Sequence, residues 1–150
     1  MNNDSIIFDD ARLEKIWRRV FNGQDELDER SMENILALEY ELFALSHKLL
    51  SRYRTLINPY IAEKSRRIRK LEARYYILTQ SRYSKPAFSQ NAADIRTLYD
   101  TSAALSALYT STAVSAVPDI AAMYRKYANA ETRFCGRILY IIEQSVLKHH

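Results

Sequence analysis

Glycine and proline are scarce in this chain. Its 150 residues include only 2 glycines and 3 prolines. Strands joined by tight turns depend on these residues, so their scarcity argues against a β-rich fold. Cysteine is scarcer still, because Cys135 stands alone and has no internal partner for a disulfide. A lone cysteine fits a reducing compartment, so we expect a cytoplasmic protein.

Long apolar runs and a targeting signal are also missing. No stretch approaches the ~18 consecutive apolar residues that are needed to cross a bilayer. The N-terminal sequence MNNDSIIFDD is acidic and lacks the basic region and the long apolar run of a signal peptide. The sequence therefore predicts no membrane association.

Excess charge of one sign is small as well. The formal net charge is +4 and the sequence pI is about 9.2. Basic residues gather over residues 64–74, but Glu63 and Glu72 interleave with them at salt-bridging spacing. This pattern favours a solvated helix face over a nucleic-acid-binding surface. Phosphate-binding loops and dinucleotide fingerprints are not found.

Apolar residues, by contrast, are abundant and recur at steps of three or four, which predicts an all-α protein. We expect one domain, residues 1–150, with an N-terminal helix within residues 1–22 and a helical bundle over residues 31–147. The five helices are predicted at about residues 10–21, 31–53, 58–80, 91–116 and 119–147. We expect Gly23 to end the first helix, and Ser31, Asn58-Pro59 and Asn91 to begin the next three.

The connections suggest how the bundle helices are arranged. Short connections make the second and third helices antiparallel neighbours, and likewise the fourth and fifth. The middle connection has roughly ten residues, which can span about 33 Å when extended. A helix of ~22 residues has a similar length. We therefore favour one crossover connection that returns along the bundle, although a simple up-down-up-down bundle also fits these lengths.

One charged residue interrupts the apolar face of the last helix. Glu131 stands in the middle of a stripe with helical spacing, formed by Ile120, Tyr124, Tyr127, Glu131, Phe134, Ile138 and Ile141. A buried carboxylate is costly unless it is paired or bound to a metal ion. Helical bundles use such a carboxylate to hold iron or manganese, so the partners of Glu131 become the central question.

The chain resembles the rubrerythrin-like branch of the ferritin-like superfamily over about residues 10–147. The local matches are the segments Leu13 to Val20 and Ala73 to Thr79, together with the pair Tyr99 and Tyr109. The first two are similar to segments of small bacterial ferritin-like proteins. The resemblance implies a four-helix bundle with one crossover connection and an extra N-terminal helix. It also implies a glutamate on each bundle helix and a histidine three residues after two of these glutamates.

The resemblance can be transferred to this chain position by position. The first glutamate position falls on Glu41, with Glu39 as the alternative. The remaining positions fall on residues that mostly differ from the family pattern: Lys64 for the second glutamate, Arg67 for its histidine, Ser102 for the third glutamate, Glu131 for the fourth and Phe134 for its histidine. A register shifted by one would instead place Glu63 and Arg66 on the second helix, both well away from the apolar stripe.

Two carboxylates and no histidine would then remain of the metal site. Lysine brings a positive charge into the site, and arginine does not lose its proton there. We therefore expect a degenerate site without metal, in which Glu41 and Glu131 pair with Lys64. Two alternatives stay open. Lys64 and Glu131 can reach solvent at the bundle edge, or iron or manganese can still bind.

These expectations give two hypotheses for the function. The first is a non-catalytic, metal-free relative of ferritin-like di-iron proteins that acts as a structural or protein-interaction module, with a homodimer or another protein as partner. The alternative is a ferritin-like metal-binding protein or oxidoreductase with a partial carboxylate site. No catalytic residue and no organic cofactor is predicted. The histidines do not change this, because His47, His149 and His150 have no ligand-type neighbours at metal-binding spacing.

Overall fold

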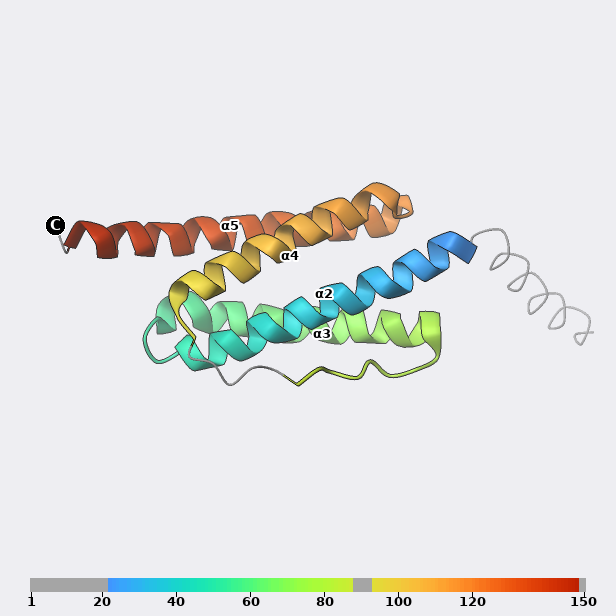
Figure 1. Ribbon diagram of the computed structural model, residues 1–150, viewed down its shortest axis with the longest axis horizontal. Coiled ribbons are helices and arrows are strands. Elements are labelled where there is room, and N and C mark those ends of the chain that lie inside the picture. The colour runs from blue at the N-terminus through green and yellow to red at the C-terminus, as the bar shows by residue number, and fades with distance from the viewer. Residues whose placement is uncertain (1–21, 88–92, 149–150) are drawn as a thin grey trace, which may run out of the picture.

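The computed structural model describes residues 22–87 and 93–148, and these form four helices and no strand. The helices are α2 (Asn22–Leu49), α3 (Arg54–Thr79), α4 (Ile95–Ser115) and α5 (Pro118–Lys148) (Figure 1). The prediction of an all-α protein is confirmed. The N-terminal helix predicted within residues 1–22 lies outside the described residues, apart from Asn22, where α2 begins.

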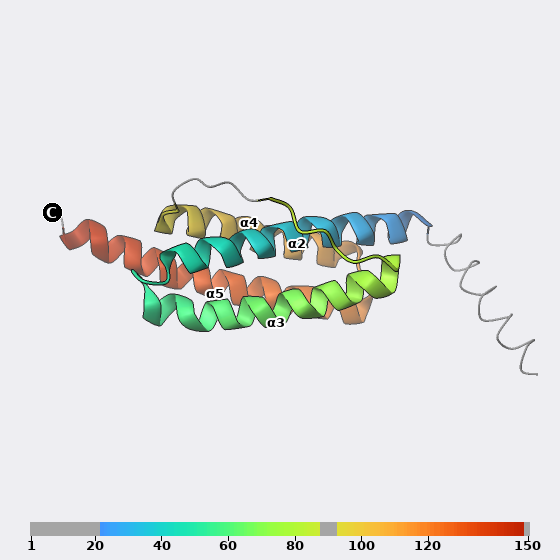
Figure 2. The ribbon, with the colours of Figure 1, turned by 90° about the horizontal axis from the view of Figure 1, so that it is seen from below.

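The four helices form an elongated bundle of two antiparallel hairpins. Helix α2 packs on α3 and on α4, and α4 packs along α5. Helix α3 ends at one end of the bundle and α4 begins at the other, so α3 and α4 run in the same direction (Figures 1 and 2). The middle connection therefore returns along the bundle, and the simple up-down-up-down order is excluded for these helices.

Three helix boundaries have clear local causes. Gln80 adopts a left-handed conformation with φ 58° and ends α3, while its backbone N–H donates to the carbonyl of Tyr76. Asp94 caps α4, because its carboxylate accepts a hydrogen bond of 2.7 Å from the backbone N–H of Thr97. The expected cap at Asn91 was therefore wrong by three residues. Pro118 begins α5, close to the predicted break.

The predicted starts of two helices were also wrong. Helix α2 begins at Asn22 rather than at Ser31, so Gly23 lies within it. The glutamates that follow are good helix formers, and acidic residues suit the positive end of a helix dipole. Helix α3 begins at Arg54 and contains Pro59. Near a helix start a proline removes only one backbone hydrogen bond, so α3 tolerates it.

All four helices contribute to one apolar core that runs along the bundle. The fully buried members include Ile35 and Leu42 of α2, Ile57 of α3, Leu105 of α4 and Ile138 of α5. No helix among the described residues has the length and apolar character to cross a membrane. The C-terminal part of α5 extends past the other three described helices, so none of these lies beside its last turns (Figures 1 and 2).

Candidate functional site

Charged side chains lie in the middle of this core. Glu39 of α2, Lys64 of α3 and Glu131 of α5 each have 0% exposed surface, and Arg67 of α3 has 2%. Ser102 of α4 is also fully buried. Every helix of the bundle therefore contributes a polar side chain to a single buried ionic cluster.

Helical spacing explains why these residues are buried. Glu39 lies four residues after Ile35 and three before Leu42, so it shares their apolar face. Residues one helical turn away on the other three helices are buried in the same way: Tyr60 and Ile68 flank Lys64, Leu98 and Leu105 flank Ser102, and Ala128 and Phe134 flank Glu131. The fold therefore places the charges in the core through the same periodicity that builds the core.

Two cations bridge the two carboxylates. The Lys64 Nζ donates to Glu39 Oε1 at 2.8 Å and also to Glu131 Oε1. The Arg67 Nη1 donates to the same two oxygens, at 3.2 Å to Glu39 and 2.7 Å to Glu131. Arg67 also donates through Nη2 to the half-buried Glu63, at 2.7 Å. The protein itself thus supplies the positive charge that buried carboxylates require.

Hydroxyl groups complete the coordination of Glu131. Its second oxygen, Oε2, accepts hydrogen bonds from the Ser102 Oγ at 2.6 Å and from the Tyr60 hydroxyl at 2.8 Å. The Tyr109 hydroxyl donates to Glu39 Oε1 at 3.2 Å. Both oxygens of Glu131 are therefore held by protein donors from α3 and α4, which fixes the carboxylate in place.

The environment determines which groups are ionised. Burial alone would raise the pKa of Glu131, but the charges of Lys64 and Arg67 and the hydrogen bonds outweigh it, so this pKa is lowered. Burial would lower the pKa of Arg67, yet the nearby carboxylates raise it, Glu39 most. Burial and the charge of Glu131 raise the pKa of Tyr60 well above its usual value. At neutral pH the cluster therefore contains ionised Glu131 and Arg67 and a neutral Tyr60.

Two buried polar atoms of the cluster have no hydrogen-bond partner in the described part of the chain. Among the described residues, no hydrogen bond reaches Glu39 Oε2 or leaves Arg67 Nε, although both atoms are buried. Glu131 is thus bound through both oxygens, whereas Glu39 is bound through one. The cluster is asymmetric, and α5 holds the better-satisfied carboxylate.

The carboxylate from α2 is Glu39, so the choice of Glu41 was wrong. Glu41 is half-buried and takes no part in the cluster, whereas Glu39 contacts both cations. The prediction rested on a stripe through Leu38 and Leu45, but both of these residues are only half-buried. The spacing Met32, Ile35, Glu39, Leu42, Ser46 and Leu49 marks the face that is fully buried.

Phe134, Tyr60 and Tyr109 have distinct places around the cluster. Phe134 stacks on the ring of Tyr60, with the ring centroids 3.5 Å apart and an interplanar angle of 3°. The hydroxyls of Tyr60 and Tyr109 point into the cluster, where they donate to Glu131 and Glu39, respectively. Helical spacing places each tyrosine on the face of a predicted site residue, Tyr60 four residues before Lys64 and Tyr109 seven after Ser102, but it does not identify the partner of either hydroxyl.

Comparison with known proteins adds no assignment to this geometry. No protein-family model matches the chain, and no curated protein or solved structure is significantly similar to it. The buried ionic cluster must therefore be interpreted through its own chemistry.

That chemistry does not fit a two-metal centre. Among residues 22–87 and 93–148, no group of three or more histidine, cysteine, aspartate or glutamate side chains converges as metal ligands do. Two carboxylates meet here, but Lys64 and Arg67 stand between them and add positive charge where cations would bind. His47 lies exposed against the edge of Phe43.

Proposed function

We propose that this chain is a metal-free relative of the ferritin-like di-iron proteins that serves as a structural or protein-interaction module without catalytic activity. The observation that carries this proposal is the Lys64 Nζ, which lies between Glu39 and Glu131 and donates to both. A protein-borne ammonium group there supplies the charge that a metal ion supplies in a di-iron bundle.

The arrangement of the helices supports the family part of this proposal. One crossover connection makes α3 and α4 parallel, which is the order that the resemblance implies (Figure 1). Each helix contributes one or two polar side chains to the cluster. The resemblance implies metal ligands at most of these positions. Ser102 occupies the third glutamate position and binds Glu131 instead of a metal.

The state of Glu131 supports the non-catalytic part of the proposal. A general acid needs a proton to give, but Lys64 and Arg67 lower the pKa of Glu131 and keep it ionised. A general base or metal ligand needs a free lone pair directed at its target, but protein donors occupy both oxygens of Glu131. The cluster is therefore built to hold helices together.

Exposed apolar side chains support an interaction role. Large apolar residues are more than half exposed at both ends of the bundle: Tyr76, Ile77, Val114, Val117, Tyr140, Val146 and Leu147. Apolar groups gathered at the surface are typical of contact surfaces between proteins. They are unnecessary for the internal core, which is complete without them.

Metal content tests the proposal. The chain is expressed in iron- and manganese-supplemented medium, and the purified protein is examined by elemental analysis and by thermal unfolding with and without a chelator. We expect no stoichiometric iron or manganese and the same melting temperature in both samples. Anaerobic incubation with Fe(II), followed by desalting, serves as the loading control. Two retained metal ions per chain, with a chelator-sensitive melting temperature, would contradict the proposal and favour the metal-binding alternative.

A further inference from the structure

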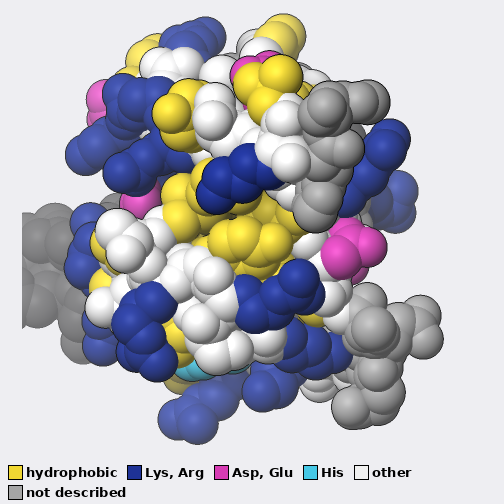
Figure 3. All heavy atoms as spheres, turned by 90° about the vertical axis from the view of Figure 1, so that its left-hand side faces the viewer, with side chains coloured by type: hydrophobic (Ala, Val, Ile, Leu, Met, Phe, Trp, Pro, Cys, Tyr) yellow, Lys and Arg dark blue, Asp and Glu magenta, His cyan; other side chains and the backbone are white. Residues whose placement is uncertain are grey.

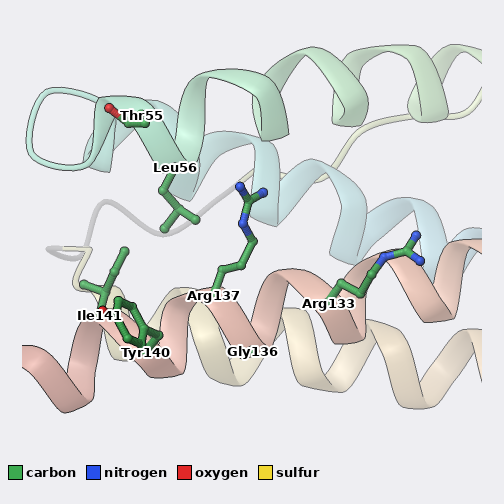
Figure 4. Close-up of a pocket in the computed structure, with 7 residues that line it drawn as sticks. All are labelled: Thr55, Leu56, Arg133, Gly136, Arg137, Tyr140 and Ile141. Carbon is green, nitrogen blue, oxygen red and sulfur yellow. The ribbon is translucent and has the colours of Figure 1, made fainter.

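The end of the bundle at which α3 begins and α5 overhangs carries an apolar groove. It has a volume of about 640 Å³ and lies between the first turn of α3 and the middle of α5. Leu56 points from α3 toward α5, and Ile141 and Tyr140 line the opposite side (Figure 4). Viewed from this end, apolar side chains fill the centre of the face and lysine and arginine side chains surround them (Figure 3).

Two arginines give the groove a positive wall. Arg133 and Arg137 lie one turn apart on α5 and both line the groove. They also line a smaller adjoining pocket of about 330 Å³, so both arginines stand at the border between the two hollows. Among the described residues, no carboxylate lies within ion-pairing distance of either arginine, and the ion pair of Glu63 is made with Arg67. The groove thus favours an occupant that is apolar and acidic.

Gly136 is a second sign of an occupant. It lies between the two arginines, inside the long helix α5, where a glycine is less favourable than alanine. A Cβ atom at this position would meet nothing within 4 Å. Nothing within the described chain therefore requires a glycine here. Close approach of another chain would require one, because a bare backbone lets a partner come nearer.

The chain itself contains a segment with the matching chemistry. Near the N-terminus, Ile6, Ile7 and Phe8 are flanked by Asp4 on one side and by Asp9 and Asp10 on the other. This segment combines three large apolar side chains with three negative charges. It complements a groove that combines apolar walls with two arginines that have no ion-pair partner among the described residues.

Length decides which copy of the chain can supply the segment. Phe8 precedes Asn22 by 14 residues, which span at most about 46 Å. The groove lies at the far end of α2, whose 28 residues are about 42 Å long. The segment of the same chain would reach it only when stretched almost fully. If residues 10–21 form the predicted helix, the reach falls to roughly 27 Å and the groove is out of range.

We propose that the groove between α3 and α5 binds the segment Asp4–Asp10 of a second copy of this chain. Two copies that lie antiparallel bring each segment to the groove of the other, which gives a closed dimer with two equivalent contacts. Ile6, Ile7 and Phe8 enter beside Leu56 and Tyr140, and the aspartates face the arginines. This inference rests on the interaction role proposed above, because it names the partner.

Charge reversal in the full-length chain tests the contact. Sedimentation velocity should show a dimer for the unchanged protein. The groove variant, Arg133→Glu with Arg137→Glu, and the segment variant, Asp9→Lys with Asp10→Lys, should each be monomeric. An equimolar mixture of the two variants should form a heterodimer, since each acidic surface then meets a basic one. The control variant, Arg125→Glu with Lys126→Glu, changes the same charge on exposed positions of α5 outside the groove and should remain dimeric.

A steric variant tests the groove without changing charge. Gly136→Leu should convert the dimer to a monomer that melts at the same temperature as the monomeric groove variant, since a Cβ atom at this position meets nothing within 4 Å. A monomeric unchanged protein, dimeric groove and segment variants, or a mixture that stays monomeric would each overturn the inference. Metal analysis gives an independent result. A dimer that retains two metal ions per chain contradicts the metal-free function alone, and a metal-free monomer contradicts this contact alone.

Discussion

The centre of the bundle and its groove end both depart from the usual distribution of side chains. The centre buries charged groups, and the groove end exposes apolar ones. At the centre, two carboxylates and two cations are buried where apolar groups are expected. At the groove end, Tyr140 is 62% exposed and Leu147 66% exposed, where polar groups are expected. The buried charges are matched within the chain, whereas the exposed apolar groups are not. This difference is the reason why we propose a second chain as partner for the groove end and none for the centre.

We expect the largest effect from a substitution that removes one of the two buried carboxylates at the centre. Glu131→Gln leaves Lys64 and Arg67 buried with only one full carboxylate, so we expect a loss of about 3–5 kcal/mol in the free energy of unfolding. Urea unfolding followed by circular dichroism measures this. Replacing Lys64 with Met and Glu131 with Leu together should recover much of the loss, because the charge and its partner leave as a pair.

A matched surface pair provides the control for that measurement. Arg96 and Asp100 lie 3.9 Å apart at 84% and 64% exposure. Because such a pair is solvated, Asp100→Asn should change the free energy of unfolding by less than about 0.5 kcal/mol. If Glu131→Gln has an effect as small as this, Glu131 is solvated and the buried ionic cluster does not exist as described.

Acid should weaken the buried ionic cluster at the centre of the bundle. The folded pKa of Glu131 is lowered, so its contribution to stability is complete above the unfolded value of about 4.3 and disappears as the pH falls through the folded pKa. We expect the unchanged protein to lose stability below about pH 4.3, and the Glu131→Gln variant to show a shallower loss. Unfolding curves across this range measure both slopes. Equal slopes would show that Glu131 titrates normally.

We expect the smallest effect from a substitution in the groove, where an added methyl group tests whether the chain itself needs a glycine. Gly136→Ala adds a methyl group that meets nothing and improves the helix, so the monomer should gain about 0.5–1 kcal/mol. The measurement uses the groove variant with Arg133→Glu and Arg137→Glu, in which the groove is empty. A stability loss instead would mean that the backbone at Gly136 has a packing role inside the chain.

The sequence was a good guide where periodicity and chain breaks agreed. Helix α5 combines a long apolar stripe with a start at Pro118, and its predicted extent and the burial of Glu131 were both correct. Local signals failed where more than one reading was physically allowed. Pro59 can begin a helix or lie within its first turns, and Gly23 can end a helix or be carried inside one.

The candidate site shows the same limit. On α2, a stripe through Leu38 and one through Glu39 both have helical spacing, and only packing against α3 and α4 selects the second. Lys64 was found because the neighbouring apolar positions fix its phase. The hydroxyl contacts of Tyr60 and Tyr109 join residues 71 and 70 positions apart, so no local pattern could have revealed them.

The charges of the cluster are divided between the two hairpins in a way that favours the pairing of unlike hairpins. The hairpin of α2 and α3 brings Lys64, Arg67 and Glu39 to its buried inner face, with the half-exposed Glu63 at the edge beside Arg67, so one fully buried positive charge has no fully buried partner there. The hairpin of α4 and α5 brings one fully buried negative charge, Glu131. Two copies of either hairpin would bury like charges together, whereas one of each is neutral. A chain cut within the middle connection should therefore reassemble from unlike halves, and a nascent first hairpin would have to wait for α5 before its interior charge is balanced.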